Sequence, residues 1–97
     1  MDRVTFHRLA ERELNDAAKY YEIECRGLGS SFLQEADRCL RLIDEHPEAG
    51  AALHGGIRRR LLRRFPYALF YKSNVDGVRI LAVMNLKRHP TYWVGRE

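Results

Sequence analysis

The sequence has few cysteines and no long hydrophobic run. Its two cysteines, Cys25 and Cys39, form neither a Cys-x-x-Cys pair nor a Cys/His pattern with zinc-ligand spacing. We therefore expect buried, reduced thiols that contribute to packing. No apolar stretch approaches the ~18 residues of a membrane-spanning helix, and the first residues have none of the features of a signal peptide. These absences lead us to expect a cytoplasmic protein.

The usual patterns of catalytic and metal-binding sites are missing as well. His7, His46, His54 and His89 show no paired ligand spacing. The sequence contains no glycine-rich phosphate loop, no nucleophile elbow and no paired-carboxylate site. It therefore predicts no metal site and no cofactor.

Acidic residues are scarce in the second half of the chain. Residues 51–97 contain 2 acids and 10 bases, net +8, whereas residues 1–50 contain 11 acids and 7 bases, net −4. A localised positive field of this kind suits nucleic acid, phosphate or an acidic protein partner. The alternative is that acidic helices neutralise a basic sheet within the same molecule.

The basic residues are concentrated between Arg58 and Lys72, in the sequence RRRLLRRFPYALFYK, which contains no acid. Successive side chains of a strand point to opposite faces, so the arginines would occupy both faces. Because burial of an unpaired charge is costly, we expect this strand to border a surface that binds an acidic partner. Arg59 and Arg60 are the preferred contact residues, with Arg63 and Arg64 next. The alternative is that two of these four pair with helix acids such as Asp37 or Glu45.

Two stretches have the periodicity of amphipathic helices. Gly27–Gly29 separates them, Ser31 and Gln34 have the spacing of a capping box that opens the second helix, and His46-Pro47 ends it. Their apolar positions recur at helical spacing: Ala10, Leu14, Ala17 and Tyr21 in the first, and Phe32, Ala36, Leu40 and Ile43 in the second.

Four further stretches have strand character: Val4–Phe6, Ile57–Phe65, Tyr67–Ser73 and Val78–Asn85. Residues 74–77 form a turn in which Gly77 can adopt positive φ, and Pro66 falls between strands because proline cannot donate to a ladder. The aromatic residues at helix and strand spacing are expected to be mostly core. Residues 1–97 therefore predict one α+β domain of order β-α-α-β-β-β, with a two-helix hairpin packed on one face of an antiparallel sheet and the other face free for function.

Five segments together carry a family resemblance. They are Ala10–Tyr21 (AERELNDAAKYY), Gly27–Glu35 (GLGSSFLQE), Ile43–Pro47 (IDEHP), Arg59–Tyr71 (RRLLRRFPYALFY) and Ile80–Pro90 (ILAVMNLKRHP). In this order and spacing they resemble the RelE/ParE superfamily of bacterial toxins from type II toxin–antitoxin systems. The resemblance is strongest to the ParE-like, plasmid-stabilisation branch, in which Phe-Pro-Tyr leads into the third strand.

The resemblance implies a toxin that is neutralised by a cognate antitoxin. The antitoxin would have an acidic, partly disordered C-terminal segment that wraps the toxin and adds to its sheet, and the two proteins would form a hetero-oligomer. Two modes of toxicity occur in the superfamily: ParE-like members poison DNA gyrase, whereas RelE-like members cut messenger RNA on the ribosome.

Two positions favour the gyrase mode over the ribonuclease mode. RNA-cleaving relatives typically have an arginine where this chain has Ala68, and many have a histidine where it has Asn85. We therefore expect a growth inhibitor that poisons DNA gyrase and is not an enzyme. The alternatives are an endoribonuclease, with Arg64, Lys87, Arg88 and Tyr92 as its candidate residues, and a solitary, non-toxic binding module. For contact with the target or the antitoxin, the candidates are Arg58, Arg59, Arg60, Arg63, Arg64, Arg88, Tyr92 and Trp93.

Overall fold

A computed structural model describes residues 3–87 and 93–97 of the chain. The elements follow the order β1 (Val4–Phe6), α1 (Arg8–Glu24), α2 (Leu28–Glu45), β2 (Ala51–Ala52), the 3-10 turn η1 (His54–Gly56), β3 (Arg58–Leu61), β4 (Tyr67–Asn74) and β5 (Gly77–Asn85). This order confirms the predicted α+β architecture and adds the two-residue strand β2, which the sequence did not predict. Among the described residues, no helix is both long and apolar enough to span a membrane.

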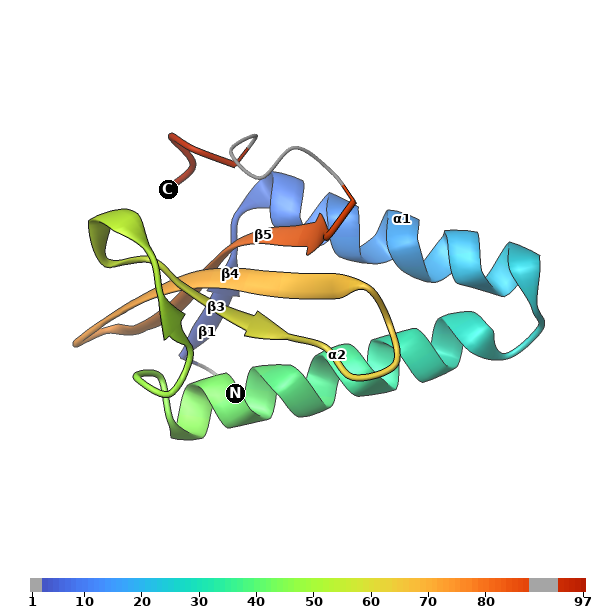
Figure 1. Ribbon diagram of the computed structural model, residues 1–97, viewed down its shortest axis with the longest axis horizontal. Helices are drawn as coiled ribbons and strands as arrows, with labels where there is room; N and C mark the ends of the chain where they lie inside the picture. The colour runs from blue at the N-terminus through green and yellow to red at the C-terminus, as the bar shows by residue number, and fades with distance from the viewer. Residues whose placement is uncertain (1–2, 88–92) are drawn as a thin grey trace.

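Helices α1 and α2 form an antiparallel pair that covers one face of the sheet (Figure 1). The hairpin extends past the strands to the turn that joins the helices. Close approach of the helices depends on Gly29, where an added Cβ would lie 2.5 Å from the carbonyl oxygen of Ala18. The predicted apolar positions of both helices face the sheet or the partner helix, and α2 ends at Glu45, as the His46-Pro47 pair predicted.

The start of α2 differs from the prediction. The helix begins at Leu28, with Gly27 as its N-cap in the left-handed region at φ 87°. The Ser31 hydroxyl donates to the carbonyl oxygen of Gly27 and therefore caps no amide. The carboxylate of Glu22 in α1 accepts hydrogen bonds from the amides of Gly27 and Gly29 at 3.0–3.1 Å. The capping-box prediction was wrong because an acid of the neighbouring helix satisfies the amides that a local cap would otherwise bind.

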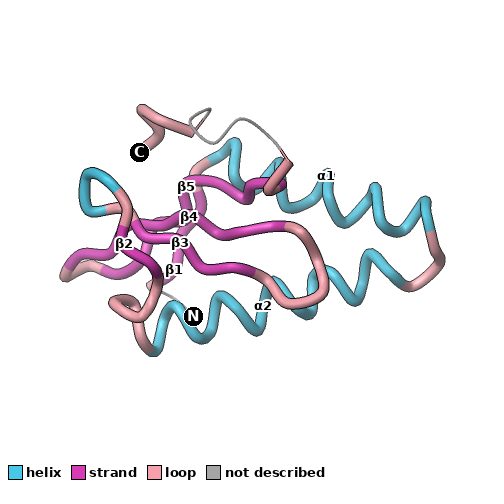
Figure 2. The backbone as a smooth tube through the Cα atoms, viewed as in Figure 1, coloured by secondary structure: helices cyan, strands magenta, loops and turns pink. Residues whose placement is uncertain are grey.

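The five strands form one sheet in the order β1-β5-β4-β3-β2 (Figure 2). The pairs β4–β5, β3–β4 and β2–β3 are antiparallel, whereas the edge strand β1 runs parallel to β5. The parallel pair corrects the expectation of an entirely antiparallel sheet. It arises because the two helices intervene between β1 and the remaining strands, so the chain returns to the sheet through a long crossover.

Strand β3 is shorter than predicted. It ends at Leu61 and not at Phe65, because Arg64 adopts a left-handed φ of 71° and Pro66 cannot continue a ladder. Leu62 and Phe65 nevertheless turn inward and join the core beneath the helices. The exposed arginines that lie between them, Arg63 and Arg64, therefore lie on a loop.

Apolar side chains fill both faces of the sheet. The larger core lies beneath the helices and includes Phe32, Ile43 and Tyr71. A smaller cluster on the opposite face joins Phe70 to Trp93, whose ring centroids lie 4.9 Å apart. The face opposite the helices is therefore only partly open. Strand β5 is buried along nearly its whole length.

The two cysteines occupy different environments. Both are free, Cys39 within the core and Cys25 exposed at the C-terminus of α1. Burial raises the pKa of the Cys39 thiol to about 11, although the charges of Arg60 and Arg38 oppose the shift. The prediction of a buried thiol was wrong for Cys25, because the helix ends there and the chain turns away from the core.

Candidate functional site

The candidate surface centres on the arginine segment, residues 58–64. Arg58 and Arg60 lie on the helix side of β3, opposite Tyr71 and Leu69 of β4. Both arginines are half-buried. The guanidinium of Arg58 donates to the carbonyl oxygen of Gly50 at 2.8 Å. Arg58 therefore helps to hold the connection between α2 and β2, in addition to any binding role.

Arg59 and Leu61 lie on the face opposite the helices. They pair with Phe70 and Ala68, which belong to the smaller apolar cluster. Arg59 is half-buried and the Leu61 side chain is exposed. Since strand alternation sends the guanidinium of Arg59 away from the helices, Arg59 is the β3 arginine best placed to reach a partner on this face.

Arg63 and Arg64 follow on the exposed loop between β3 and β4. The main-chain amide of Arg63 donates to the carboxylate of Glu35, which also accepts two hydrogen bonds of 2.7 Å from Arg38. The hydrogen bond from Arg38 is the main cause that lowers the pKa of Glu35, and burial partly opposes it. The guanidinium of Arg64 lies 5.7 Å from the ring centroid of Phe65.

None of the five arginines of this segment forms an ion pair within residues 3–87 and 93–97. The two acids considered as internal partners do not pair with these arginines. Asp37 pairs with Arg41 at 3.0 Å, and Glu45 forms no ion pair with a described residue. Self-neutralisation by helix acids therefore does not account for this cluster of positive charge.

Part of the outer edge of β3 is open. Strand β2 pairs with Arg58 and Arg59 only, and no described strand pairs with β3 beyond them. The amide of Leu62 donates to Tyr67 in β4, so strand alternation directs the amide of Leu61 outward. A main-chain donor, an exposed leucine and flanking arginines thus lie together at this edge.

The other predicted residues are more dispersed. Arg88 and Tyr92 lie outside the described residues. Trp93 is buried against Phe70, which leaves little of its ring available to a partner. Lys87 is exposed just after β5, and its amide donates to the side-chain oxygen of Asn85 at 2.9 Å.

The two positions that favour the gyrase mode also have clear structural settings. The Ala68 methyl group is fully buried beside Trp93 and Met84 in the smaller cluster. Asn85 is half-buried and its amide oxygen caps the turn after β5. Neither side chain offers a group that titrates near neutral pH.

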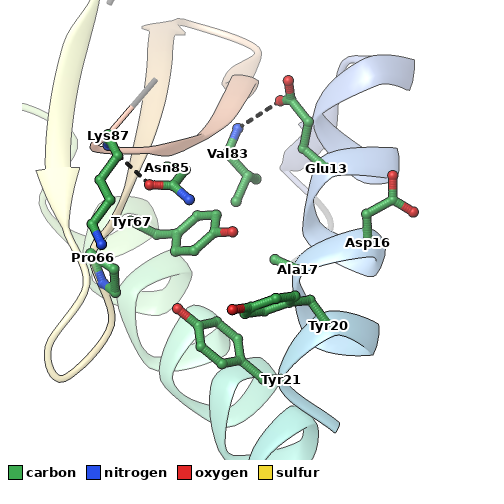
Figure 3. Close-up of a pocket in the computed structure, with 10 residues that line it drawn as sticks. All are labelled: Glu13, Asp16, Ala17, Tyr20, Tyr21, Pro66, Tyr67, Val83, Asn85 and Lys87. Atoms are coloured by element: carbon green, nitrogen blue, oxygen red, sulfur yellow. Dashed lines mark hydrogen bonds between the residues drawn. The ribbon is translucent and has the colours of Figure 1, made fainter. Parts of the chain in front are cut away.

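A cavity of about 440 Å³ opens between α1 and the adjacent ends of β4 and β5 (Figure 3). Tyr20, Tyr21 and Tyr67 supply its aromatic wall, Glu13 and Asp16 line it from α1, and Lys87 lies across from them. Burial is the main cause that raises the pKa of Tyr21, and Tyr67 and Tyr20 add to it. The hydroxyl of Tyr21 therefore remains protonated and can act as a hydrogen-bond donor.

The sequence analysis missed this cavity because it assigned most aromatic residues to the core. Most of these residues are buried or half-buried, as predicted, and Tyr20 is the exception at 56% exposed. The helical pattern gave a signal, since Tyr20 falls outside the predicted apolar positions Ala10, Leu14, Ala17 and Tyr21 of the first helix. Among the described residues, no group of three His, Cys, Asp or Glu side chains could hold a metal ion.

Comparisons with known proteins agree with this architecture. The family model described as the ParE toxin of the type II toxin-antitoxin system, parDE, matches residues 4–90. A solved chain described as "Chromosomal ParDE TA system from P. aeruginosa" superposes with a TM-score of 0.72 at 17% sequence identity, covering 86% of this chain and 94% of that chain. No curated protein matches the sequence. At this identity the solved chain shows a shared fold.

Proposed function

Because the chain belongs to the ParE toxin family of type II toxin–antitoxin systems, we propose that it inhibits growth by poisoning DNA gyrase and that a cognate antitoxin neutralises it. The family match over residues 4–90 is the observation that carries the proposal. The buried methyl group of Ala68 and the amide of Asn85 support the gyrase mode, because a methyl group cannot bind phosphate and an amide cannot act as a general base in RNA cleavage.

The gyrase proposal can be tested with purified protein. We expect inhibition of DNA supercoiling by gyrase, while messenger RNA on translating ribosomes stays intact. Arg59→Gln should weaken the inhibition, because it removes an unpaired charge from the face opposite the helices. Arg41→Gln is the matched control, since Arg41 is an exposed helix residue that is already paired with Asp37.

Two results would contradict the gyrase proposal. Ribosome-dependent cleavage of message, with supercoiling unaffected, would assign a ribonuclease. Normal growth on induction without the antitoxin would assign a non-toxic binding module. In either case the unmodified protein would not inhibit supercoiling by gyrase, so Arg59→Gln would have no inhibition to weaken.

For neutralisation, we propose that an extended, acidic segment of the antitoxin adds a strand alongside β3. The outward amide of Leu61 supplies a donor for the new ladder, and the exposed arginines at and after β3 supply charge complementarity. The expected partner is the acidic-tailed DNA-binding protein encoded by a neighbouring short reading frame. An added strand on this edge would also lie beside Arg60 and Arg63.

The strand proposal predicts a specific effect of proline at residue 61. Leu61→Pro removes the outward donor and no β3–β4 bond, so it should weaken antitoxin binding about tenfold or more. Leu61→Ala removes the same exposed side chain but keeps the amide, so it should bind nearly as well as the unmodified chain. Affinity is measured by titration calorimetry, and melting temperatures establish that both variants fold. Equal affinities for the two variants would exclude main-chain pairing at this position.

A further inference from the structure

Three polar side chains form a row across the sheet near the β4–β5 turn. The strand register places Thr5 of β1 opposite Arg79 of β5, and Arg79 opposite Lys72 of β4. Phe6 and Ile80, the next pair along, belong with the helix-side core. The alternating pleat therefore sends the row to the face opposite the helices.

Arg79 and Lys72 are a pair of like charges at directly opposing positions. Such pairs destabilise a sheet unless something compensates them. The guanidinium of Arg79 donates to the carbonyl oxygen of Phe6 at 2.9 Å and to a main-chain oxygen of Glu97, the last residue of the chain, at 3.1 Å, and these two hydrogen bonds orient it. Lys72 is exposed and makes no hydrogen bond or ion pair with any described residue.

The nearby acids do not cancel these two charges. Asp76 and Glu97 lie at the same cleft, but neither carboxylate forms an ion pair with a described residue. Arg96, which also lines the cleft, is held by both oxygens of Glu13. Arg3, Lys72 and Arg79 therefore line the cleft without an ion pair to any described side-chain carboxylate.

The row lines a cleft of about 570 Å³. Its lining combines the basic side chains with the apolar side chains of Ile57 and Leu81. This volume lies within the range of small-molecule sites, which are typically apolar with a few converging polar groups. A ligand that fits both properties would have an anionic group and an apolar body.

We propose that this cleft binds a phosphate ester, with the phosphate between Arg79 and Lys72 and the organic part against Ile57 and Leu81. Two cations on opposing positions of adjacent strands lie on one face of the sheet and line the same cleft, and arginine and lysine are the usual phosphate-binding side chains. The carboxylates of an extended acidic peptide alternate between its two faces, so they would not gather at one such cleft. The Thr5 hydroxyl and the Asn74 amide add neutral hydrogen-bonding groups at the cleft.

The site is separate from the surface proposed for the antitoxin and does not depend on the gyrase proposal. Arg79 and Lys72 lie near the β4–β5 turn, whereas Leu61 pairs with Ala68 near the other end of β4. The phosphate ester has two possible sources, a free nucleotide or the phosphorylated end of a nucleic acid strand. Both present the same chemical group to the two cations.

The experiment is a binding titration of the full chain with AMP, adenosine, inorganic phosphate and a 5′-phosphorylated oligonucleotide. We expect AMP or the oligonucleotide to bind, adenosine to bind much more weakly, and inorganic phosphate to compete. Binding of AMP assigns a free nucleotide, whereas binding of the phosphorylated oligonucleotide alone assigns a nucleic acid end. Lys72→Gln and Arg79→Gln should each lower the affinity about tenfold or more.

Lys19→Gln is the control variant, because Lys19 is an exposed lysine on α1 and lies outside the cleft. It removes the same charge and should leave the affinity unchanged. Lys72→Gln should fold normally, since the Lys72 side chain forms no hydrogen bond or ion pair with a described residue. Any of three results would overturn the proposal: equal binding of adenosine and AMP, equal losses in the Lys72 and Lys19 variants, or Lys72-dependent binding of an acidic peptide without binding of a phosphate ester.

Discussion

At the scale of single residues, the hydroxyl of Tyr71 joins the sheet to the segment that follows α2. It donates to the carbonyl oxygen of Pro47 at 2.7 Å and accepts from the amide of Gly50 at 3.2 Å. Burial is the main cause that raises the pKa of Tyr71, so the hydroxyl remains a donor at neutral pH. Gly50 is needed there because an added Cβ would lie 2.3 Å from the same hydroxyl oxygen.

We expect Tyr71→Phe to lower the free energy of unfolding by about 1–3 kcal/mol, because it leaves a buried amide and a carbonyl without their partner. Tyr20→Phe is the control, since Tyr20 is largely exposed and should change stability little. Urea denaturation monitored by circular dichroism provides the comparison. Similar values for the two variants would mean that water replaces the lost hydroxyl.

His7 makes the free energy of unfolding depend on pH. Its Nδ1 accepts from the amide of Leu9 at 3.0 Å and so caps α1 in the neutral form. Desolvation lowers the pKa of His7 from its usual value of 6.5, and the positive charges of Arg96, Arg79 and Arg8 lower it further. Below pH 6.5 the unfolded chain therefore takes up a proton before the folded chain does.

Stability should consequently fall as the pH drops from 6.5 toward the lower pKa of the folded state, whereas His7 contributes no pH dependence in the alkaline direction. His7→Asn keeps an N-cap acceptor that does not titrate, so this acid-side loss should shrink. The measurement is the free energy of unfolding at a series of pH values. Parallel profiles for the two proteins would assign the pH dependence to other groups.

At the scale of elements, Gly29 determines how closely the helices approach. A side chain at this position would meet the carbonyl of Ala18 and the Cβ of Glu22, which lies 2.9 Å from an added Cβ. Gly29→Ala should therefore cost about 1–3 kcal/mol from overpacking, despite a gain in helix propensity of at most about 1 kcal/mol. Ser30→Ala, at the next and exposed position of α2, is the control. Thermal melts of both variants test the prediction, and a stabilised Gly29→Ala protein would show that the helices can move apart.

The elements also show which parts of the fold could be read from the sequence. Periodicity placed both helices, because each has one dominant buried face, and a nearly continuous apolar run placed β5, which is buried on both faces. The cap of α2 could not be read locally, since Glu22 acts from the preceding helix. The early end of β3 depended on the left-handed conformation of Arg64. Arginine rarely adopts this conformation, and no local sequence pattern predicted it.

At the scale of the whole molecule, the positive charge of the second half is only partly neutralised. Arg96 is joined to Glu13 by hydrogen bonds of 2.9 and 3.0 Å, and Glu13 also accepts from the amide of Val83. One carboxylate therefore links α1, β5 and the C-terminal segment. Both side chains of the ion pair are largely buried, with relative exposures of 12% and 22%.

Glu13→Gln should lower the free energy of unfolding by about 1–3 kcal/mol, because a largely buried guanidinium loses its counter-charge. Asp37→Gln is the comparison, since its pair with Arg41 is exposed and should contribute less than about 1 kcal/mol. Chemical denaturation of both variants provides the values. If the two losses were equal, burial would not distinguish these ion pairs.

The family resemblance and the general position of the basic surface could also be predicted from the sequence, and the family match confirms the resemblance. The row formed by Arg79 and Lys72 could not, because it depends on the register between β4 and β5 and on a shift in that register at Phe70 and Tyr71. The sequence contains both charged residues, but only the pairing of β4 with β5 places Lys72 opposite Arg79. The cavity beside Tyr20 likewise required the placement of α1 against β5.

Strand β5 pairs with both β1 and β4 and also packs against α1. It is the last of the described strands, so during synthesis the sheet lacks the strand that joins β1 to β4 until residue 85 has left the ribosome. Before that point the helical hairpin can form, but its apolar side has no complete sheet to cover it. Nascent chains halted before β5 should therefore expose the apolar side chains of an incomplete core. We expect chaperones to bind such chains and proteases to cleave them.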